Sequence, residues 1–462
     1  MTMLRACTLI LTLAATLGCQ PSDAGQQTGQ GALDPPPRKP TGDQLLQAAH
    51  SGYRTSPGTR QECIGRQVFD VPHEIEWEVK GPRSGEGLIR NAPTDKDDFS
   101  NVFPDGLYHL TSRLHYERWN LGVMAPVSRE EFDRWRAGEK DWYPKLIRMR
   151  EESIAKTKAE IAEYRKKIDG MGREGHEELV LSALEDDIER LTKDIAVFRS
   201  RIAAKFLFDS EDVFGVQEAG YYAFLFKNQR AYRIQMFGPR DQGAETPEQF
   251  DQRFADFVRR FRPRAMYEIP TEPGVCIPYG FIPDDGTGDY QVKVAFRFKD
   301  HPGVAYDFNT GLAYDARLRN SPGNHYVSNL PEPSMFRATT LGLTGLLGGG
   351  AVAGRMEKSI GPRTAKIGAI DASQGGFSII TGEADGPKVP SYTIYTATNG
   401  FPDVHILPFI VLEVSSYTRK QFPTLPEDPP PFDETMARVD TLLKSIRLRP
   451  TSPPMPELKA LK

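Results

Sequence analysis

The stretch Cys276-Ile277-Pro278-Tyr279-Gly280-Phe281-Ile282-Pro283 is the key to the fold of this 462-residue chain, because an earlier stretch follows the same plan. The earlier stretch is Cys63-Ile64-Gly65-Arg66-Gln67-Val68-Phe69-Asp70-Val71-Pro72. Each is a short strand-like run that begins with Cys-Ile and ends at a proline, which cannot continue a central strand. We interpret the two runs as matching starts of two related domains. The alternative is a chance similarity between short segments.

Each half of the chain also closes in a similar way. Residues 247–264 and 429–450 both carry apolar side chains at helical spacing. Thr246 is suited to cap the first of these helices, and Pro247 is suited to its first turn. Both helices run into an arginine-rich stretch with a proline: Arg262-Pro263-Arg264 and Arg447-Leu448-Arg449-Pro450.

Strand signals lie between these landmarks and are mixed with helices without regular βαβ spacing. Such mixing favours an α+β fold with antiparallel sheets backed by helices. The sequence therefore predicts two related α+β domains, an N-terminal one over residues 60–264 and a C-terminal one over residues 265–450. The expected strands are Tyr221–Phe226, Tyr232–Phe237, Gln291–Phe298, Phe377–Thr381, Tyr392–Thr396 and Pro408–Val414.

Residues 142–205 show a different pattern, that of a long helical hairpin. An isoleucine recurs every seven residues from Ile147 to Ile168, and a second heptad helix follows a glycine-bearing turn. We expect an antiparallel coiled-coil hairpin inserted in the first domain. Arg150 and Thr157 interrupt the apolar seam of the first helix, so its partner helix covers this face only in part. The hairpin is either an arm that contacts another protein or a pair of helices that pack only against each other.

The two ends of the chain have the composition of segments outside the folded domains. Residues 1–18 contain one basic residue and the apolar run Leu9–Leu17, which is too short to span a bilayer as a helix. With Cys19 directly after it, this segment resembles a bacterial lipoprotein signal, so we expect a lipid on Cys19. Ordinary secretion with cleavage nearby and a buried apolar helix are the alternatives. We expect residues 19–59 to be a disordered tether and residues 451–462 a disordered tail.

The four cysteines divide between the signal and the body of the chain. Cys63 and Cys276 are the two that remain beside the lipidated one. In an oxidising compartment such a pair predicts a disulfide between them. The alternative is two unpaired thiols that behave as small buried apolar residues.

Charge and motifs exclude several classes of protein. Lys and Arg number 58 and Asp and Glu number 62, so the formal net charge of −4 gives no general reason to bind nucleic acid. The chain lacks the G-x-S-x-G and H-E-x-x-H motifs, and its eight histidines are scattered. We therefore expect no catalytic residues, no metal site and no cofactor.

Two kinds of motif resemble binding or catalytic sites only weakly. The glycine-rich run Gly348–Ala353 has the form of a dinucleotide loop, but Gly361-Pro362 leaves no room for the long helix such a loop needs. We expect a flexible loop or a pair of tight strands there. The acidic pairs Asp97-Asp98, Asp186-Asp187 and Asp284-Asp285 do not place two carboxylates on one face, so we expect them to be solvated.

Three blocks resemble one protein family. The first is residues 63–72, the second is residues 268–282, and the third is residues 408–414 with the closing residues 445–450. Together they span nearly all of the chain after the tether. These blocks resemble the Tle cognate immunity proteins, two-domain bacterial immunity proteins against type VI secretion lipase effectors. The helical hairpin is longer than the one this family usually carries, and the glycine-rich region 342–354 also departs from the family pattern.

The resemblance implies a function without catalysis. Such a protein stays in the periplasm, binds a phospholipase of α/β-hydrolase type and blocks substrate or membrane access to its active site. The lipidated Cys19 would anchor it, by expectation to the outer membrane, and would be its sole membrane contact. Exposed aromatic side chains are candidate anchors for the partner, with core packing as the alternative for each: Tyr221, Tyr222 and Tyr326.

Two other functions compete with this interpretation. One is a structural or adhesive envelope lipoprotein that has no toxin partner. The other is an envelope hydrolase with an unfamiliar site.

Overall fold

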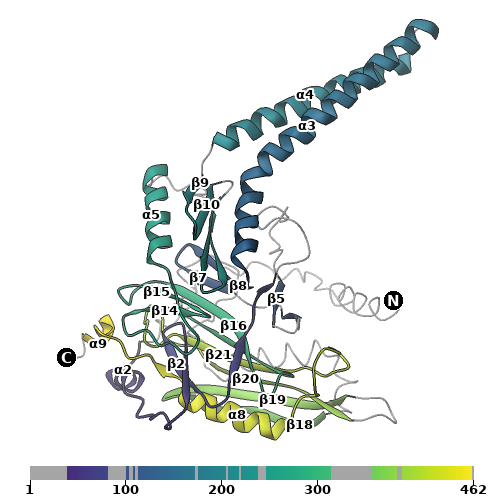
Figure 1. The fold of residues 1–462 in the computed structure, drawn as a ribbon. Coiled ribbons are helices and arrows are strands. Elements are labelled where there is room, and N and C mark those ends of the chain that lie inside the picture. The colour runs from purple at the N-terminus through teal and green to yellow at the C-terminus, as the bar shows by residue number, and fades with distance from the viewer. Residues whose placement is uncertain are drawn as a thin grey trace, which may run out of the picture. The chain divides into compact units, whose positions relative to one another are not determined.

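The computed structural model describes residues 39–81, 100–103, 108–109, 113–171, 175–203, 206–217, 220–237, 246–313, 356–381 and 388–459. These residues form a mixed α+β fold with a 16-stranded, almost entirely antiparallel sheet, two small three-stranded sheets and a long helix pair (Figure 1). The expected α+β class with antiparallel sheets and helices is confirmed.

The described residues of the N-terminal half supply twelve strands. Two of them, β1 and β2, form a hairpin outside the large sheet. The strands are β1 (Arg60–Ile64), β2 (Gln67–Val71), β3 (Ile75–Trp77), β4 (Val79–Gly81), β5 (Ser100–Val102), β6 (Tyr108–His109), β7 (Arg113–Tyr116), β8 (Trp119–Pro126), β9 (Phe206–Asp209), β10 (Val213–Gln217), β11 (Gly220–Lys227) and β12 (Arg230–Phe237).

The C-terminal half continues the same sheet. Its backbone is the order β18-β19-β20-β21-β17-β16-β7-β8-β12-β11-β10-β9, in which β16 joins the strands of the two halves. All six strands expected from the sequence lie on this path. The strands after residue 261 are β13 (Arg262–Pro263), β14 (Gly274–Ile277), β15 (Gly280–Pro283), β16 (Tyr290–Phe298), β17 (Val304–Gly311), β18 (Met356–Ile367), β19 (Ile370–Thr381), β20 (Val389–Thr398), β21 (Phe409–Ser416) and β22 (Arg447–Leu448).

Both expected closing helices are present and pack on the sheet. Helix α5 (Pro247–Arg260) begins with a capping box in which the Thr246 hydroxyl accepts from the Gln249 N–H. Its apolar face packs on Trp119 of β8. Helix α8 (Phe432–Ser445) buries its apolar face in the same core. The helices end at Arg260 and Ser445, and the arginine-rich stretches that follow them contain the strands β13 and β22.

The long helix pair is α3 (Arg129–Met171) and α4 (Gly175–Ala203), which lie side by side (Figure 1). The seam is as the heptads predict, since isoleucine and leucine side chains of both helices are buried along it. The expected start at residue 142 is wrong, because α3 already begins at Arg129. The reason is that Phe132 is buried against Phe214 and Phe226, so the first turns of α3 belong to a core cluster at the sheet.

Two segments expected to be disordered are partly structured instead. Within the expected tether, α2 (Gly42–Ala49) is a helix with a capping box at Thr41. Within the expected tail, α9 (Pro456–Lys459) follows the buried Met455. The correction has a packing reason, because Ala48 and Met455 share a small apolar cluster with Phe401, Ile406 and Leu407. Both segments are polar on average, so their composition did not reveal the few apolar residues that are buried.

Candidate functional site

The two stretches that begin with Cys-Ile form two matching hairpins that meet. Each has a two-residue turn, and Cys63 faces Val68 in the β1–β2 hairpin as Cys276 faces Phe281 in the β14–β15 hairpin. In the structure the two cysteines form a disulfide, with an S–S distance of 2.12 Å. Beside it, Gly65 and Cys276 exchange two backbone hydrogen bonds of 2.8 Å. We call this region the hairpin junction.

The closing strands of the two halves cross over at the hairpin junction. Strand β13, which ends the first half, pairs with β15 of the second half. Strand β22, which ends the second half, pairs with β2 of the first half. Each half therefore completes the small sheet of the other, and neither small sheet consists of one half alone.

Two buried ion pairs hold the hairpin junction together. Glu62 and Arg264 lie 2.6 Å apart, with side chains 0% and 1% exposed. Arg66 and Asp284 form a bidentate pair with N–O distances of 2.7 and 3.0 Å, and their side chains are 1% and 3% exposed. Burial disfavours the charge of Arg66, but the hydrogen bonds and the charge of Asp284 outweigh it and raise the pKa of Arg66.

Buried arginine side chains also donate hydrogen bonds to backbone carbonyl oxygens at the strand ends. Arg264 donates to the carbonyl oxygens of Cys63 and Ile277, both at 3.1 Å. Arg449 donates to the carbonyl oxygens of Glu272 and Gly274, both at 2.8 Å. Burial is the main reason that the pKa of Arg449 falls to about 10. These contacts link both closing stretches to the strands that carry the disulfide.

The ion pair of Arg66 fixes the loop of residues 284–289, which joins β15 to β16. Asp284 also accepts from the Gly286 N–H at 2.8 Å, and Asp285 accepts from the Thr287 N–H and hydroxyl at 2.9 and 2.6 Å. The hydrogen bonds from Thr287 lower the pKa of Asp285. Gly288 is required for close approach, because a Cβ atom there would lie 2.1 Å from the Tyr116 hydroxyl.

This loop borders an open pocket of about 770 Å³. Its other wall is the β7–β8 turn with Glu117 and the end of α5 with Arg260. The Glu117 N–H donates to the Asp289 carbonyl at 2.8 Å, which joins the two walls. Burial raises the pKa of Glu117, although the nearby Arg260 lowers it in part. With Asp284 neutralised by Arg66, the lining carries more negative than positive charge.

The described residues also bear on metal binding and on membrane crossing. In the described part of the chain, no group of three or more His, Cys, Asp or Glu side chains is placed to hold a metal ion. Over the same residues, no helix has the length and apolar character needed to cross a membrane. The site is an open, partly acidic pocket, and the buried ion pair Arg66–Asp284 holds the loop on one side of it.

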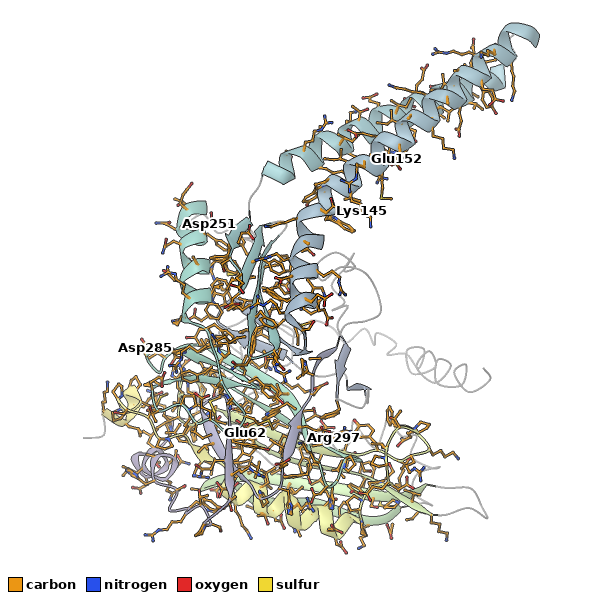
Figure 2. All side chains as sticks on the ribbon, viewed as in Figure 1. Glu62, Lys145, Glu152, Asp251, Asp285 and Arg297 are labelled. Carbon is orange, nitrogen blue, oxygen red and sulfur yellow. A yellow bond between two sulfur atoms is a disulfide. The ribbon has the colours of Figure 1, made fainter. Side chains whose placement is uncertain are left out.

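The structure sorts the residues singled out in the sequence. Tyr221 is buried against Phe250, so it is a core residue, and Tyr222 is half-buried. The expectation that Asp284 is solvated is wrong, because its carboxylate is buried in an ion pair with Arg66. Its neighbour Asp285, labelled at the left edge of the molecule in Figure 2, is exposed. Four positions or runs lie outside the described residues: Cys19, Asp97-Asp98, Tyr326 and Gly348–Ala353.

Sequence reasoning missed the charged residues of the hairpin junction. Glu62 and Arg66 flank Cys63-Ile64, and Arg264 belongs to the first arginine-rich stretch. This position next to the repeated stretches is the one sequence feature that could have indicated their role. Glu62, labelled in Figure 2, is fully buried. Nothing in the local sequence pairs these residues, since Glu62 and Arg264 come from opposite ends of the first half.

The region that contains the β14–β15 hairpin and the 284–289 loop matches a family of immunity proteins, not of enzymes. Residues 268–335 match the family described as Tle cognate immunity protein 4 C-terminal domain. This match confirms the resemblance drawn from the sequence. The matched span includes β14, β15, the 284–289 loop, β16 and β17.

Solved structures with a similar arrangement include the immunity protein TplEi of the type VI secretion system from Pseudomonas aeruginosa. Its complex with an "L" peptide is 14% identical, with a TM-score of 0.43, over 86% of this chain and 100% of that one. Its apo structure is 15% identical, with a TM-score of 0.43, over 85% and 98%. A chain of the Tle4–Tli4 complex is 14% identical, with a TM-score of 0.44, over 86% and 100%. Because these TM-scores are below 0.5, they do not bear on function. A search of curated proteins finds no match.

Proposed function

We propose that the chain is an immunity protein that binds a Tle lipase effector in the periplasm and blocks access to the effector's active site. The observation that carries this proposal is the family match of residues 268–335. The matched residues form one side of the hairpin junction and the loop beside the pocket. A surface held by buried ion pairs and a disulfide is preorganised, which lowers the entropic cost of binding a partner.

Co-expression with the effector tests the proposed function directly. The partner is a lipase with a G-x-S-x-G elbow, sent to the periplasm of a host cell with or without this chain. We expect the chain to restore growth, and the purified chain to inhibit the purified lipase at a one-to-one ratio. Equal killing with and without the chain contradicts the proposal and favours an envelope lipoprotein without a toxin. Lipid hydrolysis by the purified chain alone would instead support the hydrolase alternative.

We also infer that the two halves are related domains. Arg264 and Arg449 support this, because they stand at the same place after their closing helices. Each donates its backbone N–H to a turn residue of the opposite hairpin at 2.9 Å, Arg264 to Tyr279 and Arg449 to Arg66. The equivalent positions of Cys63 and Cys276 in their hairpins support the same inference.

The acidic pocket is a candidate contact for a basic region of the effector. Replacing Asp285 by Asn and Glu117 by Gln removes two negative charges and keeps the side-chain shapes. We expect the affinity for the effector to fall about tenfold, mostly through a slower association rate at low salt. Calorimetry or surface plasmon resonance at two salt concentrations checks this.

The control for that measurement is a variant with the same charge change elsewhere. Asp371 and Asp186 are exposed and do not line the pocket. Replacing both by Asn should leave the affinity within about twofold, because charges remote from an interface contribute little at moderate salt. An equal loss in both variants would mean that net charge matters and the pocket does not.

For the helix pair we predict a structural role rather than contact with the effector. Its apolar seam is buried within the pair, and its arms are joined by exposed ion pairs such as Arg165–Glu185 and Glu151–Arg199. Replacing Met149–Arg201 by a short glycine linker should therefore keep the affinity for the effector. A loss of tenfold or more would show that the helices touch the partner.

The lipid anchor is a separate proposal, supported by the signal-like residues 1–18 and by Cys19 directly after them. We expect mass spectrometry of detergent-extracted protein to find a diacylglyceryl group on Cys19. A mature N-terminus without lipid at that position contradicts the anchor, and with it the placement at the outer membrane. It leaves effector binding unaffected.

A further inference from the structure

The hairpin junction combines a disulfide with charges that are satisfied only when both halves are in place. Cys63 and Cys276 are both 0% exposed, and 213 residues separate them. Around them lie the pairs Glu62–Arg264 and Arg66–Asp284, each of which joins a residue of the first hairpin to a residue far along the chain.

Assembly of the hairpin junction is therefore cooperative. A charged side chain that loses water on burial is destabilising unless its partner is already present. Glu62 finds its partner only when the stretch after α5 is docked, and Arg66 finds its partner only when the β14–β15 hairpin is docked. Before that point the unfolded chain gains nothing from bringing these charges together.

The disulfide favours assembly of the hairpin junction because it restricts the unfolded chain. A bond that closes a loop of 213 residues removes much of the conformational freedom of the unfolded state. It also keeps β1 beside β14, where the Gly65–Cys276 hydrogen bonds form. Because the sulfur atoms are fully buried in the folded chain, a reductant in solvent has no access to them once folding is complete.

From this we propose that oxidation of Cys63 and Cys276 is an obligatory maturation step, so that the chain gains its folded, effector-binding state only in an oxidising compartment. The part about effector binding rests on the proposed function. Two S–H bonds are lost and one S–S bond forms, while a disulfide-bearing thiol oxidase accepts the two electrons and the two hydrogens and becomes a dithiol. The same chain retained in a reducing compartment stays unassembled at the hairpin junction.

The test compares one chain in two redox states, without a substitution. The full chain is unfolded, then refolded either with its disulfide intact or with both thiols kept reduced. Limited proteolysis measures folding, and inhibition of the lipase measures binding. We expect the reduced chain to be cleaved roughly 100-fold faster or more and to lose inhibition in parallel. Reoxidation should restore both, and reductant added to the already folded chain should change neither within hours.

A matched variant separates the bond from the packing of the sulfur atoms. In the double variant Cys63→Val and Cys276→Val, the sites stay apolar but cannot be joined, so we expect the behaviour of the reduced chain, with or without reductant. Equal protease resistance of the oxidised and reduced native chains overturns the proposal. If the oxidised chain is resistant but does not inhibit the lipase, the proposed function fails while the redox-dependent folding stands.

Discussion

Replacing Glu62 by Gln lowers the free energy of unfolding by about 3–5 kcal/mol, the range for a buried ion pair that loses one partner. The Glu62 carboxylate lies 2.6 Å from the Arg264 guanidinium, and it accepts from the Cys63 N–H at 2.8 Å and from the Tyr267 N–H at 3.3 Å. Gln has the same shape, but its amide NH₂ must face one of these donors, and the charge of Arg264 is left buried without a counterion. Urea unfolding followed by circular dichroism measures the change.

Glu74 provides the control for this prediction. It also pairs with an arginine, Arg60 at 3.2 Å, but both side chains are about half exposed. Glu74 also pairs with Lys299 at 3.0 Å. Water screens such exposed pairs, so Glu74→Gln should leave the midpoint of urea unfolding nearly unchanged. If the two variants differ by less than about 1 kcal/mol, the buried pair does not stabilise the hairpin junction as we infer.

Replacing Phe257 by Ala should also lower the free energy of unfolding by about 3–5 kcal/mol, the usual cost of a large cavity in a core. Phe257 is 2% exposed and stacks on Trp119 with ring centroids 4.5 Å apart. It holds α5 against the sheet, and α5 leads directly to Arg264. The same urea titration measures the loss, and proteolysis should find new cleavage near residue 260.

The control here is an apolar side chain that solvent already reaches. Leu179 on α4 is 70% exposed, so Leu179→Ala should change the free energy of unfolding by less than about 0.5 kcal/mol. A small effect of Phe257→Ala would mean that α5 is held by its capping box and surface charges rather than by the aromatic stack.

Local patterns predicted the elements of this protein well. Six strands, both closing helices and the helical seam lie where alternation and heptads place them, because each such pattern reports one face of one element. The same reasoning underestimated α3, α2 and α9, because their order depends on apolar clusters made with distant segments. Phe132 is ordered by β10 and β11, and Met455 is ordered by residues near Phe401.

The sequence by itself determined that two Cys-Ile stretches follow one plan and that each is followed much later by a helix and an arginine-rich stretch. The structure shows that each stretch, read from the sequence as a strand-like run, is a hairpin. Their resemblance to the immunity family also came from the sequence. Only the tertiary structure decided that the closing strands cross over, β13 to β15 and β22 to β2, and that Glu62 meets Arg264 and Arg66 meets Asp284. The physical reason is that the sequence does not show whether a charged side chain is buried. Its environment is set by segments hundreds of residues away, which only the folded chain brings together.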